Sequence, residues 1–274
     1  MTIINTHAGS QILALFLDSQ VKLLVENVSA INQSNQPRIS NLYAIYSAII
    51  EDATSIRLLC ENGRTNQAYI ISRALIERVT NFCFLQLCTD ATFSDYLDYS
   101  LNKAGRSLDQ SIEANGKVKA RLALNGGDFD LPHEISAAIA KFTSERGREK
   151  TRWTNVSLPE RAAVIEAKLG STGLFMSLLA IYANASEALH GTIYGAVFHL
   201  GAYEAKPPHD QVSLDCHFRQ TLSTLYLMAG ASIDTLFGLL ASLGNESFDA
   251  AAHASKNAFK EAAIAAGLTV AKGS

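Results

Sequence analysis

The chain has 274 residues, of which 48% are hydrophobic and 18% charged, and its formal net charge is -3. This composition can fill a large core and is typical of a globular protein rather than a disordered one. Without an excess of Lys and Arg, the whole surface is not expected to attract nucleic acid or anionic lipid. Any contact with phosphate therefore has to be local.

Helical periodicity runs through the sequence, and no segment alternates β-branched with polar residues between turn signals. The sequence predicts an all-α fold, a multi-helix bundle of antiparallel helices in one domain, 1–274. The helices at 65–88, 173–199 and 213–243 are the most apolar and are expected to be central. The other predicted helices are 10–33, 39–61, 90–124, 133–145 and 246–267, with the first and the last peripheral, and a capping box at 157–160 predicts the start of a further helix.

Two features indicate the compartment. The four cysteines form no C-x-x-C pair and predict reduced, mostly buried thiols, while the N-terminal apolar run has no Lys or Arg before it, so a secretory signal is not expected. Residues 220–244 are long enough to cross a bilayer, but Asp234 near the middle would cost about 2.5 to 3.5 kcal/mol there. We expect a buried helix rather than a membrane span, hence no membrane partner and a cytoplasmic location.

Two of the central helices each carry a polar pair. Arg73 and Glu77 lie four residues apart on one face of 65–88, a spacing typical of an ion pair. Ser186 and His190 lie four apart on 173–199, on an apolar stripe that is expected to face the core. These positions predict one internal cluster of Arg73, Glu77, Ser186 and His190. The stripe consists of Leu179, Ala183, Ser186, His190, Ile193 and Val197.

These motifs carry a resemblance. The segment IRLLCENGRTNQAYIISRALIERVTNFCFL with its R-x-x-x-E, Trp153, and ASEALHG with its S-x-x-x-H resemble a family of all-helical bacterial proteins of unknown function, over about residues 45–200. More distantly, the helical histidine is similar to that of HEPN domains. Many of those are dimeric, metal-independent ribonucleases of toxin-antitoxin and phage-defence systems, with an Arg-x(4 to 6)-His motif.

The resemblance implies catalytic roles for the cluster. His190 would act as general base or acid on a ribose hydroxyl or leaving oxygen, and Arg73, held by Glu77, would stabilise charge on phosphate. Ser186 would orient the imidazole. The positions five to seven residues before His190 are alanine, asparagine and alanine, so Arg73 has to replace the missing arginine. Two alternatives stay open: a ligand site, and a polar cluster that only fixes helix packing.

A charged stretch, KFTSERGREKTRW, places five basic residues before the only tryptophan. Guanidinium groups beside an aromatic ring can bind phosphates and stack on unpaired bases, which predicts local contact with RNA or a nucleotide. Glu145 and Glu149 offset part of the charge, and a solvated loop is the alternative. The candidate nucleic-acid-binding residues are Arg146, Arg148, Lys150, Arg152 and Trp153.

No metal and no cofactor is expected. His199, His209 and His217 are too widely spaced to share a helical turn, and no P-loop or dinucleotide-type glycine cluster is present. The last helix, 246–267, carries small residues and two phenylalanines on one face. That face is expected either to pack on its own bundle or to dock a second copy as a homodimer, and a partner protein encoded nearby is a further alternative.

The sequence thus supports two functional hypotheses. The first is a HEPN-like protein of bacterial defence or stress response that cleaves RNA without metal. The second is a non-catalytic helical module for binding or interaction, in which the Arg73, Glu77, Ser186 and His190 cluster is structural.

Overall fold

The computed structural model describes residues 6–124, 130–244 and 246–267. The chain divides into two compact units, a division that no feature of the sequence indicates. The bundle unit consists of Met1–Leu87 and Leu158–Ser274, and the inserted unit of Cys88–Ser157.

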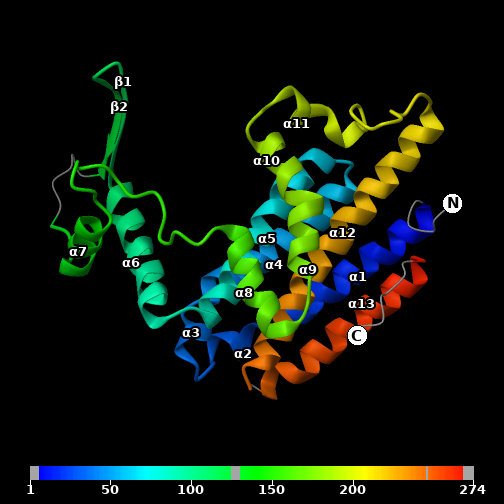
Figure 1. Ribbon diagram of the computed structural model, residues 1–274, viewed down its shortest axis with the longest axis horizontal. Helices are drawn as coiled ribbons and strands as arrows, with labels where there is room; N and C mark the ends of the chain where they lie inside the picture. Colours follow the sequence, from blue (N-terminus) through cyan, green and yellow to red (C-terminus); the bar gives the residue numbers. More distant parts are fainter. Residues whose placement is uncertain (1–5, 125–129, 245, 268–274) are drawn as a thin grey trace. The chain divides into compact units, whose positions relative to one another are not determined.

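Within its described residues the bundle unit contains helices joined by loops and no strand, as predicted (Figure 1). Two long helices, α5 and α12, form its centre and pack against each other. Its helices are α1 (His7–Glu26), α2 (Val28–Asn32), α3 (Pro37–Ser40), α4 (Tyr43–Glu61), α5 (Thr65–Leu87), α8 (Leu158–Leu169), α9 (Gly173–Ser177), the π-helix η3 (Leu178–Tyr182), α10 (Ala183–Leu189), α11 (Ile193–Val197), the 3-10 helix η4 (Phe198–Leu200), α12 (Gln211–Ser242), the 3-10 helix η5 (Glu246–Phe248) and α13 (Asp249–Ala265).

The predicted central helices at 65–88 and 213–243 are confirmed, with ends within two residues of those expected. The start of α12 is set by a capping box, in which the Asp210 carboxylate accepts from the Ser213 amide at 2.8 Å. Near its middle, a Cβ on Gly230 would lie 2.2 Å from the ring of Phe16. The absence of a side chain at this glycine therefore lets α1 approach α12 closely.

The C-terminal helix α13 packs against α1 and α12 of its own chain, which Figure 1 shows at one side of the bundle. Phe259 meets Phe16 of α1 edge to face, with the ring centroids 5.8 Å apart, and Ser255 is fully buried. Of the two expectations for this helix, packing on its own bundle is confirmed. Most of the face proposed for docking a second copy is therefore occupied.

The predicted helix over 173–199, in which Gly191 and Gly195 are the expected points of a bend, is divided near the first of these glycines. The chain leaves the helix at His190 and Gly191, where Gly191 has φ 68°, a conformation that favours glycine. The Thr192 side chain then caps α11 by accepting from the Gly195 amide at 3.0 Å. A cap of this kind starts a new helix in a new direction, which a purely periodic reading of apolar residues does not detect.

The predicted core-facing stripe of this region is wrong. Leu179 and Ile193, two members of that stripe, are 77% and 80% exposed. The buried positions lie on another face, at the helical spacing of three to four residues. They are Leu174, Ser177, Ile181 and Ala185.

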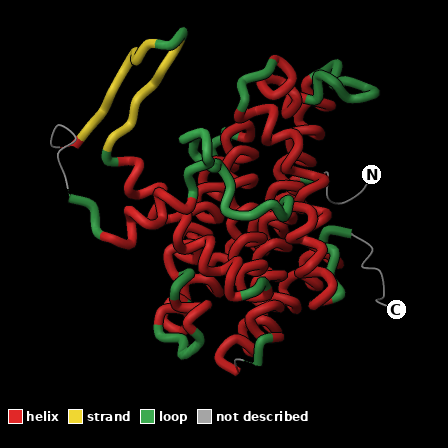
Figure 2. Tube along the Cα trace, turned by 60° about the vertical axis from the view of Figure 1, so that its left-hand side comes forward, coloured by secondary structure: helices red, strands yellow, loops and turns green. Residues whose placement is uncertain are grey.

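The inserted unit contains α6 (Asp90–Ser107), the strands β1 (Asp109–Ala114) and β2 (Lys117–Ala123), and α7 (His133–Lys141). The predicted helix 90–124 is therefore wrong in its second half, which forms an antiparallel hairpin, drawn in yellow in Figure 2. The turn is Asn115-Gly116, with φ values of 54° and 69°. Asn-Gly is the strongest short-range hairpin signal, because both residues tolerate positive φ.

Two further helices are shorter or more divided than expected. The predicted helix 10–33 is broken at Asn27 into α1 and α2, and the predicted helix 133–145 ends at Lys141. Within the inserted unit, α6 and α7 pack against each other at Gly105, where a Cβ would lie 2.5 Å from Ile135. The chain then turns back on itself at 142–150, where the backbone amide of Lys150 donates to the Phe142 carbonyl at 2.8 Å.

Candidate functional site

A polar cluster lies between α5 and the η3–α10 region, which pack against each other. Arg73 and Glu77 form the ion pair that their spacing predicts, with Nε of Arg73 and Oε1 of Glu77 3.5 Å apart. The Arg73 side chain is 19% exposed and that of Glu77 38% exposed. The pair is therefore partly removed from water, and its charges need further partners.

Tyr182 supplies those partners. Its hydroxyl donates to Oε1 of Glu77 at 2.6 Å and accepts from Nη2 of Arg73 at 3.1 Å, and the guanidinium lies over its ring, 4.6 Å from Cζ to the centroid. Burial, followed by the hydrogen bond to the Glu77 carboxylate, raises the pKa of Tyr182, so the phenol keeps its proton. We call Arg73, Glu77 and Tyr182 the cross-helix cluster.

Tyr182 reaches this position at the end of a π-helix. In η3 the backbone follows an i to i+5 pattern, which inserts an extra residue into the turn and rotates the residues that follow. Regular helical spacing, on which the predicted stripe depends, therefore assigns the wrong side of this helix to the core. For this reason Tyr182 was not among the predicted site residues. Its only sequence signal is an aromatic hydroxyl in an otherwise apolar run, LLAIY.

The other two predicted residues do not join the cross-helix cluster. Ser186 is half-buried one turn after Tyr182, and its carbonyl accepts from the His190 amide at 3.0 Å. His190 is exposed at the C-cap of α10. In the described part of the chain, neither side chain makes a hydrogen bond to Arg73 or Glu77. The structure therefore brings together two of the four predicted residues.

Two hydrogen bonds of the cross-helix cluster converge on one oxygen, Oε1 of Glu77. The Glu77 carboxylate and the Tyr182 hydroxyl are hydrogen-bonded to each other and to Nη2 of Arg73. Within this cluster, Nη1 of Arg73 is the one buried atom that has no hydrogen-bond partner among the described residues. A general base or nucleophile needs an accessible atom with a free lone pair. The Glu77 oxygen in the cluster already accepts hydrogen bonds from both partners.

The charged stretch of the inserted unit is an ordered turn, not the irregular loop expected. The Ser144 amide donates to the Arg148 carbonyl at 2.8 Å, the Gly147 amide donates to the Ser144 carbonyl at 2.8 Å, and Gly147 has φ 71°. Residues 144–148 thus form a tight loop, which we call the basic turn together with the following residues up to 152.

Three arginines of the basic turn, Arg146, Arg148 and Arg152, are exposed. Of the two nearby acidic residues, Glu149 is engaged elsewhere: it pairs with Lys103 at 2.7 Å and also accepts from Asn102 at 3.3 Å, which holds the pKa of Glu149 below its usual range. Glu145 is exposed beside Arg146, and the ion pairs of the described residues do not include it. Among the ion pairs of the described residues, none involves these three guanidinium groups.

The remaining predicted nucleic-acid residues have partners inside the unit. Lys150 is exposed but its ammonium donates to the Lys141 carbonyl at 3.2 Å. Trp153 is half-buried and packs edge to face on Tyr96, with the centroids 5.1 Å apart. Lys141 itself is paired with Asp95 and Asp98. Stacking of a base on Trp153 is thus limited to the part of the ring left exposed.

The fold and these two sites define a helical protein with a polar cluster between helices of its bundle and a basic turn in an inserted unit. The chain belongs to DUF5677, a family of unknown function, whose pattern matches residues 41–206. This range contains the cross-helix cluster and the basic turn. No curated protein and no solved structure matches the chain.

Proposed function

We propose that this protein is a non-catalytic helical binding module that contacts RNA through the basic turn of its inserted unit. One observation carries the proposal: Arg146, Arg148 and Arg152 extend from an ordered turn without a carboxylate partner among the described residues. Guanidinium groups bind phosphate oxygens strongly because they offer paired donors in a fixed plane. A preformed turn also lowers the entropy lost on binding.

The role of the cross-helix cluster supports the non-catalytic form of the hypothesis. Arg73, which the HEPN resemblance would assign to phosphate, is 19% exposed and is held by Glu77 and Tyr182. To reach a phosphate it would have to leave both partners. We propose that the cluster fixes the packing of α5 against η3 and α10, and that RNA contacts lie elsewhere.

The direct test is the affinity for a labelled single-stranded RNA, measured by fluorescence anisotropy over a series of salt concentrations. The triple variant Arg146→Ala, Arg148→Ala, Arg152→Ala should bind more weakly by about tenfold or more. Its log-log salt slope should be smaller by about 2, since each phosphate contact on a single strand contributes about 0.7.

A matched control removes the same charge from the bundle unit. Lys22, Lys206 and Lys260 are exposed, and their joint replacement by Ala changes the net charge equally. Retained affinity and slope in this control, with losses in the arginine variant, would support the basic turn as the site. Equal losses in both variants would mean that only overall charge matters, and no loss in the arginine variant would refute the proposal.

Metal-independent cleavage of RNA is the second candidate, and the exposure of His190 at the end of α10 favours it, because a catalytic histidine has to be accessible. Incubation of total RNA with the wild type and with His190→Ala, without metal, tests this. Cleavage by the wild type alone would assign catalysis to His190, and intact RNA with both would leave the binding module.

We also propose a cytoplasmic location without a membrane span. Within the described residues, α1 and α12 are long and apolar enough to cross a bilayer, and 44% and 67% of their apolar windows are buried in the bundle. A core helix has the same length and composition. Recovery of the protein in the supernatant after cell lysis and ultracentrifugation would support this proposal, and recovery in the membrane pellet would refute it.

A further inference from the structure

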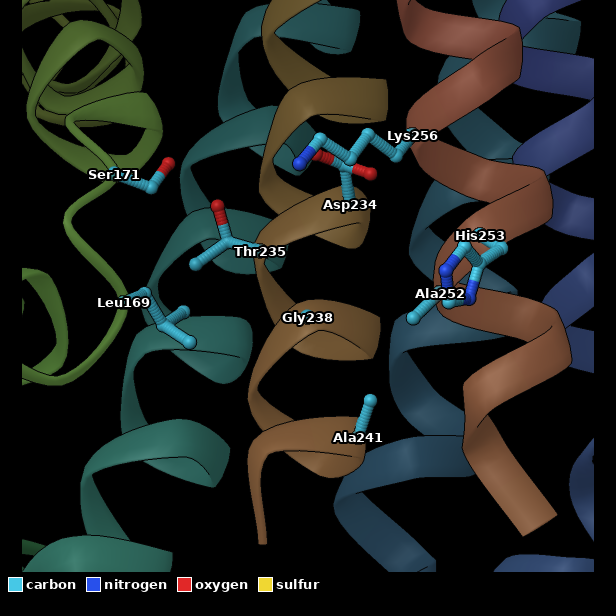
Figure 3. A pocket seen from close by; sticks show the side chains of 9 residues that line it. All are labelled: Leu169, Ser171, Asp234, Thr235, Gly238, Ala241, Ala252, His253 and Lys256. Carbon is cyan, nitrogen blue, oxygen red and sulfur yellow. The ribbon is translucent and has the colours of Figure 1, made fainter. Parts of the chain in front are cut away.

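A cleft of about 320 Å³ lies between α12, α13 and the end of α8, and none of its lining residues belongs to the cross-helix cluster or the basic turn. Figure 3 shows Asp234, Thr235, Gly238 and Ala241 along one face of α12, with α13 facing them. The volume falls at the lower end of the range of about 300 to 1,000 Å³ that is typical of small-molecule sites. Most of this cleft lies outside the residues that the family pattern matches.

The cleft contains a half-buried carboxylate, that of Asp234. Oδ1 of Asp234 accepts from the Ser255 hydroxyl at 2.6 Å, and the same hydroxyl lies 2.8 Å from Oε1 of Gln20. One hydroxyl hydrogen cannot serve both acceptors, while the Gln20 amide nitrogen faces the Ser255 carbonyl. The Asp234 carboxylate therefore has to share its protein donor, the Ser255 hydroxyl, with Gln20.

A positive charge lines the same cleft as this carboxylate. Lys256 of α13 is exposed and close enough for its charge to lower the pKa of Asp234 in part, although burial has the larger, opposite effect. The ion pairs of the described residues do not include these two groups. A cleft lined by an acid and a base offers partners to a molecule that carries both signs.

Two further groups extend this polar end. Nδ1 of His253 lies 2.8 Å from the Asp249 carbonyl, to which it can only donate, so the neutral ring presents Nε2 as an acceptor. Ser171 accepts from the Gly173 amide at 3.4 Å, which leaves its own hydroxyl hydrogen available. The cleft therefore offers two donors, from Lys256 and Ser171, and two acceptors, from Asp234 and His253.

The other end of the cleft is apolar and small. It is lined by Leu169, Gly238, Ala241 and Ala252. A Cβ placed on Gly238 would meet no atom within 4 Å, so this glycine borders open space rather than a packed neighbour. An aliphatic group could enter here and remove apolar surface from water.

We infer that this cleft binds a small zwitterion of the amino-acid class with an aliphatic side chain. Lys256 and Ser171 donate to its carboxylate, Asp234 and Nε2 of His253 accept from its ammonium group, and the side chain lies against Leu169, Gly238 and Ala241. The proposal does not depend on RNA binding, because the residues of the cleft belong to the bundle unit and those of the basic turn to the inserted unit.

The test uses L-leucine as the probe and isothermal titration calorimetry of the full chain as the measurement. Two analogues each keep one of the two charged groups of leucine. 3-Methylbutylamine keeps the amine and the apolar group, and 4-methylpentanoate keeps the carboxylate and the apolar group. Leucine should bind at least about tenfold more tightly than either analogue, since each lacks one charged contact. Equal binding of the amine would overturn the zwitterion class.

Two variants locate the binding. Gly238→Leu places a side chain in the cleft, at a position where a Cβ would meet no atom within 4 Å, and should abolish the heat of leucine binding while the protein stays folded. Lys256→Met should weaken leucine binding by about tenfold, and Lys260→Met, an exposed lysine one turn further along α13, should leave it unchanged. Binding that survives Gly238→Leu, or no heat with leucine in the wild type, would overturn the proposal.

Discussion

The two units treat their polar side chains in opposite ways. In the bundle unit, interior polar groups pair with one another across helices, as in Arg73 with Glu77 and Tyr182, or Ser177 with Ser232 at 3.0 Å. In the inserted unit, charged groups lie on an ordered turn at the surface. Partly buried charges need partners to be tolerated, whereas exposed charges without partners keep their full capacity to bind.

The comparison shows that the number of acidic and basic residues in a stretch does not predict which charges are available for binding unless their ion-pair partners are known. The charged stretch contains acidic residues that should offset its arginines, yet Glu149 pairs with Lys103 and lies 3.9 Å from Arg106, both on α6. Lys141 is likewise neutralised by two aspartates of α6. Ion pairs inside the inserted unit thus engage Glu149 and Lys141, while the three arginines and Glu145 of the basic turn stand outside the ion pairs of the described residues.

The largest expected effect breaks the cross-helix cluster. Arg73→Ala leaves Glu77 and Tyr182 without their cation, and removal of one partner from a buried ion pair costs about 3 to 5 kcal/mol. Because Glu77 is 38% exposed, we expect a smaller loss of about 2 kcal/mol in the free energy of unfolding, measured by urea denaturation.

RNA affinity should be unchanged in Arg73→Ala. This result would separate the stability of the bundle unit from RNA binding by the inserted unit. The control is Lys22→Ala, whose ion pair with Glu26 is exposed and should contribute less than about 0.5 kcal/mol. A loss of RNA binding in folded Arg73→Ala protein would contradict the structural role and favour the catalytic hypothesis.

A smaller effect is expected from Tyr182→Phe, which keeps the ring under the guanidinium but removes the hydroxyl between Arg73 and Glu77. The loss of these two hydrogen bonds should lower the free energy of unfolding by about 1 kcal/mol. Tyr203→Phe, on an exposed ring, is the matched control and should leave stability unchanged. Equal stability of the two variants would show that the ring alone holds η3 to α5.

The parts of the fold that the sequence predicts well are those set by local signals. The ends of α5 follow from the glycine at position 63 and from a run that is apolar nearly all round, and the Arg73–Glu77 pair follows from four-residue spacing. Tyr182 could not be found in this way. Its position depends on the π-helix η3, and one inserted residue changes which side of the helix faces α5.

The hairpin was missed for a different reason. Its turn signal, Asn115-Gly116, stands in the sequence, but the flanking residues include Ala, Glu, Lys and Arg, which favour helices. All residues of β1 are exposed, so burial imposes no alternation of apolar and polar side chains along it. A strand without a buried face lacks the period-two pattern on which a strand assignment depends.

A change in backbone alone tests whether the basic turn has to be ordered. Gly147 has φ 71° with open space around its Cα, so Gly147→Ala strains the turn by about 1 kcal/mol without changing charge. RNA affinity should fall by about two- to fivefold, measured by anisotropy. Gly170→Ala, with φ 65° in the bundle unit and equally open space, should carry similar strain and leave RNA affinity intact. Unchanged affinity in Gly147→Ala would mean that a disordered turn binds as well.

Asp234 tests whether a partly buried charge in the bundle unit needs partners, because its carboxylate shares its one hydroxyl donor, that of Ser255, with Gln20. Burial raises the pKa of this carboxyl, so between the unfolded pKa of about 3.9 and the higher folded value the native state holds more protons than the unfolded chain. Stability should therefore fall as pH rises through this window, and the loss is complete above the folded pKa.

Asp234→Asn removes that titration, and its amide can donate to the Ser255 hydroxyl, which then donates to Gln20. Above the window the variant should be more stable than the wild type by up to about 1 kcal/mol, and the advantage should vanish near pH 4. Thermal unfolding over a pH series, with the exposed Glu261→Gln on α13 as control, measures the difference. Parallel curves for wild type and Asp234→Asn would mean that the Ser255 hydroxyl satisfies the ionised carboxylate, and that the bundle unit leaves no interior acceptor unmatched at this point.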